Sequence, residues 1–335
     1  MQRRTLGTAC FVLASTLAWP VAAQDIQERV IKFGHLNNAD HPVSFGVKRF
    51  AELLAAKSGG KLKVQEFPAS TLGNEMQQQS ALQGGVQEMS APATTSLAGI
   101  VKEFGLLDFP FAVANFAQAD ALLDGPLGQT LIAKLPEKGL VALGYWDLGF
   151  RNVTNSKRPI NRPEDLEGLK LRVIPNPVFL ETFKAFKANP VPMPFAELYG
   201  ALEAKAVDGQ ENPFAVILSN KFFEVQKYVS ATNHVYAANI ILVGKRFWDK
   251  LSPAEQKMMN DAANESRAYQ RQVSRAAAQK AVGELQAKGM QYNEVSADQH
   301  LRMVQVAKPV TDRIAAAYDP AILKLYQDEL ARIRK

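Results

Sequence analysis

Residues 30–64, VIKFGHLNNADHPVSFGVKRFAELLAAKSGGKLKV, indicate the fold class of the chain. The stretch begins with an apolar strand and a polar loop, and Pro42 then suits the first turn of a helix. Apolar residues follow at spacings of three and four, which places them on one helix face: Val43, Val47, Phe50 and Leu54. The pair Gly59-Gly60 ends this helix, and alternation then predicts a second strand. Strand, helix and strand in this order predict an α/β fold.

The same order of elements returns in the second half of the sequence. A strand is expected over residues 169–174, a helix over residues 179–186 and another strand over residues 189–193. The repetition predicts two α/β lobes. Each lobe is expected to take two segments of the chain: residues 24–148 plus about 236–275 for lobe I, and 149–235 plus about 276–335 for lobe II.

A long helix is expected after Ser252. The residues SPAE at 252–255 have the hydroxyl, proline and glutamate of a capping box, and no further proline occurs before Gly289. A helix of about 36 residues would be about 54 Å long, which exceeds the width of one lobe. We therefore expect this helix to span both lobes.

The N-terminus has the features of an export signal. Arg3 and Arg4 precede an apolar stretch, and small residues at 21–23 predict cleavage before Gln24, so residues 1–23 are read as a signal peptide. The arginine pair also suits a twin-arginine signal, which leaves the export route open. Cys10 is the only cysteine and would leave with the signal. Disulfides, thiolate metal sites and cysteine nucleophiles are therefore not expected in the exported protein.

Composition and motifs argue against several function classes. Of the 335 residues, 47% are hydrophobic and 21% are charged, as in an ordinary folded protein. The net charge of +6 is spread along the chain without a dense basic stripe, so nucleic-acid binding is not expected. The histidines lack metal-ligand spacing, and neither a nucleophile elbow nor a phosphate-binding glycine loop occurs. We therefore expect no enzyme activity, metal or cofactor; an exported hydrolase is the alternative from another class.

Two arginines have positions that call for explanation. Arg172 lies inside an apolar strand, where a charge is costly to bury without an anion beside it. It is either exposed, on the face opposite Leu171 and Val173, or paired with an anionic ligand. Arg151 follows an aromatic stretch, and a salt bridge with a nearby acid such as Asp147 is the alternative to a ligand contact.

Three segments resemble a known family: YWDLGFR at 145–151, PEDLEGLKLR at 163–172 and AVDGQENP at 206–213. They look like the solute-binding proteins of tripartite ATP-independent periplasmic (TRAP) transporters, of the C4-dicarboxylate-binding type. The similarity extends over essentially the whole chain after the signal. It implies a two-lobed periplasmic binding protein fold with crossing strands and a long helix spanning both lobes. The lobes would close over an organic anion.

The resemblance also implies roles for single residues. Arg172 would pair with the ligand carboxylate through two parallel hydrogen bonds, and the Asn212 amide would donate to the same or a second oxygen. Phe195 would form an apolar wall. Glu75 would accept from ligand hydroxyls, with a helix N-terminal acid as the alternative. Trp146 and Arg151, in the first of the three segments, match the family's hinge-side motif and are expected to contact the ligand. Further contacts are expected from loop residues, for which core or capping roles are the alternative: Asn38, His41, Thr94 and Asn176.

These implications converge on a monomeric periplasmic receptor that is not an enzyme. Its expected ligand is a small organic acid, a C4-dicarboxylate or a similar carboxylate, and its expected partners are the membrane permease subunits of a TRAP transporter. A sugar acid or an aromatic carboxylate is the alternative ligand, because aromatic residues could line an apolar pocket: Trp146, Phe150, Phe195, Phe214 and Tyr236.

Overall fold

A computed structural model of the chain describes residues 26–335. The predicted signal peptide, including Cys10, lies outside the described residues. The described chain forms a mixed α/β structure, as expected, around a sheet with the order β2-β1-β3-β8-β4-β7-β5-β6, and β9 pairs with β8. The strands are β1 (Arg29–Gly34), β2 (Leu62–Phe67), β3 (Met89–Ser90), β4 (Leu140–Asn155), β5 (Lys170–Val173), β6 (Asn189–Pro192), β7 (Gly209–Pro213), β8 (Tyr228–Gly244) and β9 (Gln291–Glu294).

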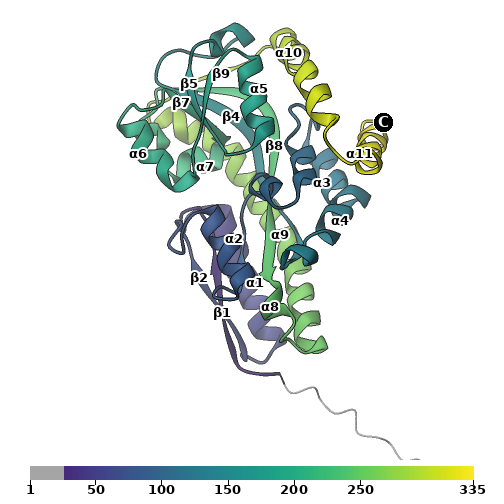
Figure 1. The fold of residues 1–335 in the computed structure, drawn as a ribbon. Coiled ribbons are helices and arrows are strands. Elements are labelled where there is room, and N and C mark those ends of the chain that lie inside the picture. Colours follow the sequence, from purple (N-terminus) through teal and green to yellow (C-terminus); the bar gives the residue numbers. More distant parts are fainter. Residues whose placement is uncertain (1–25) are drawn as a thin grey trace, which may run out of the picture.

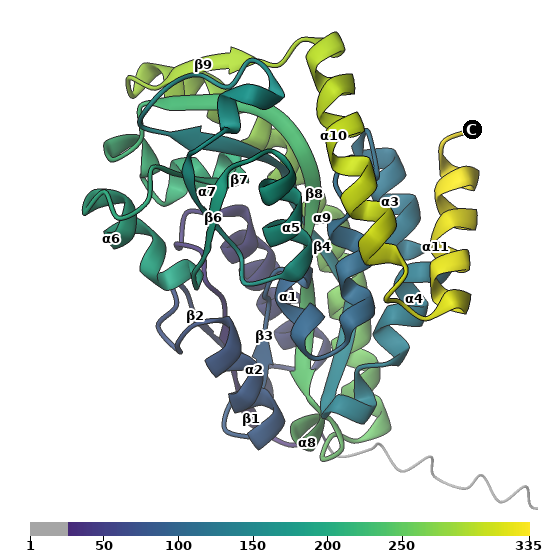
Figure 2. The same cartoon turned by 45° about the horizontal axis from the view of Figure 1, so that its top comes forward.

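Helices lie around this sheet (Figures 1 and 2). The α-helices are α1 (Pro42–Lys57), α2 (Glu75–Gly84), α3 (Phe116–Asp124), α4 (Pro126–Ala133), α5 (Pro177–Ala185), α6 (Leu198–Glu203), α7 (Phe214–Ser219), α8 (Lys245–Trp248), α9 (Pro253–Ala287), α10 (Ala297–Ala315) and α11 (Pro320–Ile333). The short 3-10 helices are η1 (Thr94–Gly99), η2 (Lys102–Asp108), η3 (Pro136–Lys138), η4 (Pro163–Leu166), η5 (Phe195–Glu197) and η6 (Phe222–Glu224).

Two groups of elements lie at opposite ends of the sheet in Figure 1. We call β1, β2, β3, α1 and α2 the β1 side, and β5, β6, β7, α5, α6 and α7 the β5 side. On the β1 side, β1 is parallel to β2 and β3, and on the β5 side, β5 is parallel to β6 and β7. Both predicted strand-helix-strand units are therefore present. The lobe boundaries proposed above stay a prediction; α11, from the C-terminal segment, packs on α3 and α4.

Two long strands connect the two sides. β4 and β8 are antiparallel to each other, and β8 pairs with β3 while β4 pairs with β7. Their register shifts between Ala142 and Tyr145 and again between Asp147 and Gly149. Gly144 (φ +133°) and Gly149 (φ +118°) lie at these two shifts, where an L side chain would strain the backbone. The glycines thus let one continuous strand bend as it crosses the molecule.

The long helix α9 also reaches both sides, as the sequence predicts. Its 35 residues begin at the Ser252 capping box and extend about 52 Å. Near its start, Met259 lies in the same core cluster as Phe33 of β1. Near its end, Leu285 packs in another cluster with Leu198 of α6. The two sides are therefore held by the same three elements, β4, β8 and α9.

Candidate functional site

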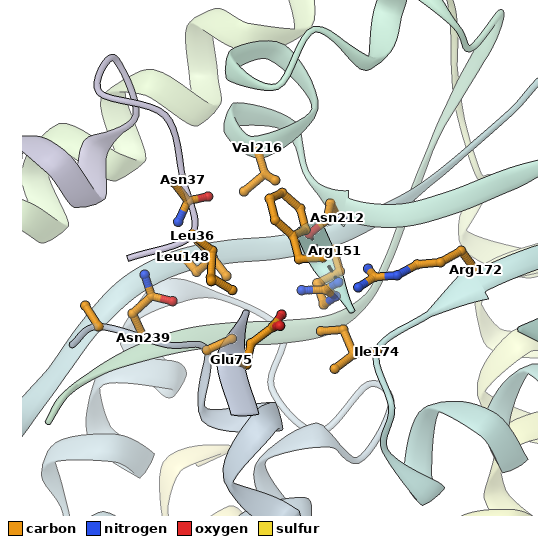
Figure 3. Close-up of a pocket in the computed structure, with 13 residues that line it drawn as sticks. Leu36, Asn37, Glu75, Leu148, Arg151, Arg172, Ile174, Asn212, Val216 and Asn239 are labelled. Carbon is orange, nitrogen blue, oxygen red and sulfur yellow. Dashed lines mark hydrogen bonds between the residues drawn. The ribbon is translucent and has the colours of Figure 1, made fainter. Parts of the chain in front are cut away.

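A cavity opens between the β1 side and the β5 side (Figure 3). Its empty volume, with the open mouth included, is about 400 Å³. Leu36 and Asn37 follow β1, whereas Arg172 and Ile174 lie at the end of β5, and all four line it. The carboxyl ends of parallel strands from both sides thus supply the lining, the usual ligand position in α/β sheets.

Arg172 is the cation whose charge is least compensated in this cavity. Its side chain is fully buried, which excludes the exposed position considered above. Nε donates to the carbonyl oxygen of Met193 at 2.8 Å, but Nη1 and Nη2 meet no partner within residues 26–335. Burial lowers the pKa of the guanidinium to about 10, against the opposing effect of Glu211 and Glu75, so it stays protonated at neutral pH. The cavity therefore offers two buried NH2 groups and a positive charge, which suit an anion.

Arg151 lies beside Arg172 in the cavity lining, but its charge is balanced by a carboxylate. Nε and Nη2 donate to the two carboxylate oxygens of Glu211 at 2.5 and 2.9 Å. Both side chains are almost completely buried. The expected alternative for Arg151, a salt bridge, is thus present with Glu211 of the neighbouring strand β7 rather than with Asp147.

His234 contacts the same carboxylate. Its Nε2 lies 3.1 Å from Glu211 Oε2, and its Nδ1 lies 2.8 Å from the Thr232 hydroxyl. Burial lowers the pKa of His234, so the ring is neutral at pH 7. Because an ionised carboxylate only accepts, Nε2 carries the proton and Nδ1 accepts from Thr232. Burial raises the pKa of Glu211, but Arg151 and His234 outweigh it and hold the pKa below its usual value. Glu211 is therefore ionised.

Glu75 and Asn212 add polar groups to the lining. Glu75 is the first residue of α2, which Asn74 caps, and it also lines the cavity. It is therefore both a helix N-terminal acid and an acid that a ligand hydroxyl could reach. In Asn212, Nδ2 donates to Gln210 Oε1 at 2.5 Å, and Oδ1 accepts from Arg151 Nη2 at 3.2 Å. Its amide is thus fixed by its neighbours, and a ligand contact from Nδ2 would be in addition to the bond with Gln210.

The cavity brings together half of the predicted ligand residues: Arg172, Arg151, Asn212, Phe195 and Glu75. The ring centroid of Phe195 lies 6.0 Å from the Arg172 guanidinium carbon, so it forms a wall beside the cation. Among the five aromatic residues considered for an apolar pocket, Phe195 lines this cavity, whereas Phe150 and Tyr236 contact each other and Phe214 contacts Tyr292.

The remaining predicted residues lie outside the cavity lining. Trp146 is fully buried and stacks on Phe33 in the core. The Thr94 hydroxyl donates to the carbonyl of Ala238 at 3.3 Å. Asn38 Nδ2 donates to the Ser219 carbonyl at 2.8 Å, a contact from the loop before α1 to α7.

Two more predicted residues cap helices. His41 Nδ1 accepts from the backbone N–H of Val43 at the start of α1. Asn176 caps α5, and its Nδ2 donates to Asp108 Oδ2 at 2.9 Å. The capping and core roles considered as alternatives for these positions are therefore the ones present.

Sequence reasoning missed two polar residues in the lining. Asn37 follows the predicted first strand, and strand ends were the expected place for ligand contacts. Asn239 interrupts the apolar run of β8, the same signal that singled out Arg172. Glu211 was quoted within a family motif, but its pairing with Arg151 depends on the β4–β7 register, which the motif does not reveal.

The described part of the chain lacks two other kinds of functional feature, a metal site and a membrane span. Within residues 26–335, no three His, Cys, Asp or Glu side chains cluster in a way that could hold a metal ion. In the same residues, no helix combines the length and the apolar character needed to cross a bilayer.

Comparison with known proteins places the chain among solute-binding proteins. Residues 33–317 match the family described as bacterial extracellular solute-binding protein, family 7. The chain is 40% identical over 275 residues to the 2,3-diketo-L-gulonate-binding periplasmic protein of Escherichia coli, covering 82% of each chain. It is 31% identical over 317 residues to the C4-dicarboxylate-binding periplasmic protein of Rhodobacter capsulatus, covering 94% and 95%.

A solved structure is similar over nearly the whole chain. The sugar acid binding protein of Advenella mimigardefordensis, in complex with galactonate, has a TM-score of 0.90 and 38% sequence identity. The match covers 92% of this chain and 100% of that one.

Proposed function

This chain belongs to the bacterial extracellular solute-binding proteins of family 7, the family of TRAP-transporter receptors, and we propose that it holds a small organic acid through Arg172. The acid lies in the cavity between the β1 side and the β5 side. The observation that carries this assignment is the fully buried guanidinium, two of whose nitrogens have no hydrogen-bond partner in the described part of the chain. A carboxylate meets such a fork through two parallel charge-assisted bonds.

The charges of the lining favour a ligand with one carboxylate. Arg151 and Arg172 are the two cations among the described residues of the lining, and Glu211 already neutralises Arg151. Glu75 brings a carboxylate into the same cavity. A second carboxylate on the ligand would therefore meet an acid without a free cation to balance it, whereas a ligand hydroxyl can donate to Glu75.

The ligand class that suits these groups is a hydroxylated monocarboxylic acid, such as a sugar acid. The names of the relatives from Escherichia coli and Advenella mimigardefordensis support this choice, since both refer to sugar acids. A C4-dicarboxylate is the second candidate, supported by the similarity to the Rhodobacter capsulatus protein. An aromatic carboxylate has less support, because Phe195 is the lone aromatic residue in the described lining.

Several finer points complete the proposal. Export removes residues 1–23, and the mature chain acts in the periplasm as a monomer. It releases its ligand unchanged to the permease subunits of a TRAP transporter. The proposal includes no catalytic step and no cofactor.

A ligand screen tests the proposal. The purified protein is first unfolded and refolded to remove any acid that co-purifies, and the released acid is identified by mass spectrometry. Thermal shifts are then measured over sugar acids, C4-dicarboxylates and aromatic acids. A ligand at about 100 times its Kd should add roughly 2.7 kcal/mol to the free energy of unfolding. If no organic acid co-purifies or shifts the transition, the assignment is wrong; turnover of a bound acid would instead support the hydrolase.

A further inference from the structure

Asn239 is a buried polar side chain whose amide nitrogen is not used in hydrogen bonds among the described residues. It lies on β8, where its backbone pairs with Trp146 of β4 and forms a bridge to Ala93. Its side chain is 1% exposed and lines the cavity. Within residues 26–335, its Nδ2 meets no hydrogen-bond partner. A buried amide left in this state is unfavourable, which points to an acceptor on a ligand.

Asn37 lies at the same end of the cavity. Figure 3 shows Asn37 and Asn239 at one end and Arg151 and Arg172 toward the other, with Glu75 below the space between them. Asn37 is 7% exposed, and its backbone carbonyl accepts from Ala69, which fixes the chain without using the side chain. Two amides thus lie opposite the cation that binds the carboxylate.

The surroundings of the two amides disfavour a charged ligand group. Leu36, Ala91 and Ala93 are apolar members of the same lining, and its two cations lie toward the other end. A carboxylate buried there would lose its hydration without gaining a positive partner. A hydroxyl or carbonyl oxygen needs only the hydrogen bonds that an amide supplies.

We propose that Asn239, together with Asn37, forms a distal subsite that binds an uncharged oxygen at the end of the ligand opposite its carboxylate. This inference rests on the proposed function and deepens it. The subsite selects acids with a terminal hydroxyl or carbonyl, and it disfavours both a methyl group and a second carboxylate at that position. Selection arises because each wrong group leaves either the amide or the ligand charge unpaired in a buried place.

Three acids that differ only at one terminal carbon test the subsite. D-Galactonate ends in a hydroxymethyl group, 6-deoxy-D-galactonate ends in a methyl group, and galactarate ends in a carboxylate. Their Kd values, with that of succinate, are measured by calorimetry on the stripped wild-type protein. We expect D-galactonate to bind about tenfold more tightly than 6-deoxy-D-galactonate, the effect of one buried hydrogen bond. It should also bind at least about tenfold more tightly than galactarate, whose second carboxylate would be buried without a cation beside it.

Variants then assign this preference to Asn239. In Asn239→Leu the Kd values for D-galactonate and 6-deoxy-D-galactonate should differ by no more than about twofold. This should result from weaker binding of D-galactonate, with binding of the deoxy acid unchanged. If Asn239→Leu fails to fold, Asn37→Ala takes its place as the test variant. Asn37→Ala should lose part of the preference for D-galactonate over the deoxy acid. Asn293→Leu on β9 is the matched control: this asparagine bonds the carbonyl of Ile160, away from the cavity lining, and its replacement should keep the full preference.

The possible outcomes separate the subsite from the proposed function. Equal affinities of wild type for D-galactonate and galactarate would overturn the subsite, as would binding of succinate alone, and both would leave the receptor assignment in place. Equal weakening of all acids in Asn239→Leu would show a structural role and would also overturn it. Absence of binding by all four acids would overturn the subsite together with the proposed hydroxylated ligand.

Discussion

Replacing Glu211 with glutamine should destabilise the ligand-free protein strongly, because it leaves Arg151 buried without its countercharge. The two carboxylate contacts measure 2.5 and 2.9 Å, and the side chains are 1% and 0% exposed. Glutamine keeps one acceptor oxygen but no charge. The carbonyl oxygen of residue 211, at 2.7 Å from Nη2, remains but cannot neutralise the guanidinium.

The expected loss is large for a single polar substitution. Removing one partner of a buried ion pair costs about 3–5 kcal/mol in the free energy of unfolding. At roughly 2–4 °C per kcal/mol, Tm should fall by about 10 °C. Urea unfolding of stripped protein, followed by tryptophan fluorescence, measures the free energy, and a thermal scan measures Tm.

Two controls make this test specific. Glu181→Gln changes a surface acid that pairs with Lys184 and Arg313, and such pairs contribute about 0–1 kcal/mol. Arg151→Gln combined with Glu211→Gln removes both charges and should recover part of the loss, because no buried charge then lacks a partner. The reasoning would be refuted if Glu211→Gln were as stable as Glu181→Gln, or if the double variant lost the sum of the two single losses.

Three further predictions concern pH, shape and export. Burial raises the pKa of Asp108 to about 7 despite hydrogen bonds from Thr95 and Asn176. The native state then binds more protons than the unfolded state between about pH 4 and 7, so the free energy of unfolding should fall by up to about 4 kcal/mol as the pH rises from about 4 to 7. Asp108→Asn should remove this part of the loss. An identical pH profile for wild type and variant would contradict the assignment. Ligand should draw the two sides together, so the radius of gyration from X-ray scattering should decrease on binding in stripped protein, and an unchanged radius would count against closure. N-terminal sequencing of the periplasmic protein should begin at Gln24, whereas an intact N-terminus in the membrane fraction would rule out cleavage.

Local patterns predicted the elements of the fold because each depends on neighbours in the sequence. The face formed by Val43, Val47, Phe50 and Leu54 is fully buried in α1, and the capping box at Ser252 begins α9. Arg172 was identified because a charge inside an apolar strand has few stable environments, and it is indeed buried at the cavity.

Tertiary pairing decided the residues that local patterns missed. Asp147 is near Arg151 in sequence, but the β4–β7 register brings Glu211 to Arg151, and Asp147 accepts instead from the Tyr236 hydroxyl. His41 and Asn176 lie in polar loops where contacts with a ligand were expected, yet both face the first turn of a helix. A loop position alone does not distinguish a cap from a ligand contact, because both use the same side-chain oxygens and nitrogens.

Calorimetry of Arg172 variants tests the central claim, that this guanidinium binds the carboxylate of the ligand. The acid identified by the ligand screen is titrated into wild type, Arg172→Ala and Arg172→Lys. Loss of a buried charge-assisted pair costs about 2–5 kcal/mol, so alanine should weaken binding roughly 30-fold to several thousand-fold. Lysine should restore only part of the affinity, because an ammonium lacks the planar two-bond geometry. Near-equal Kd values for the three proteins would contradict the claim and would make Arg151 the next candidate.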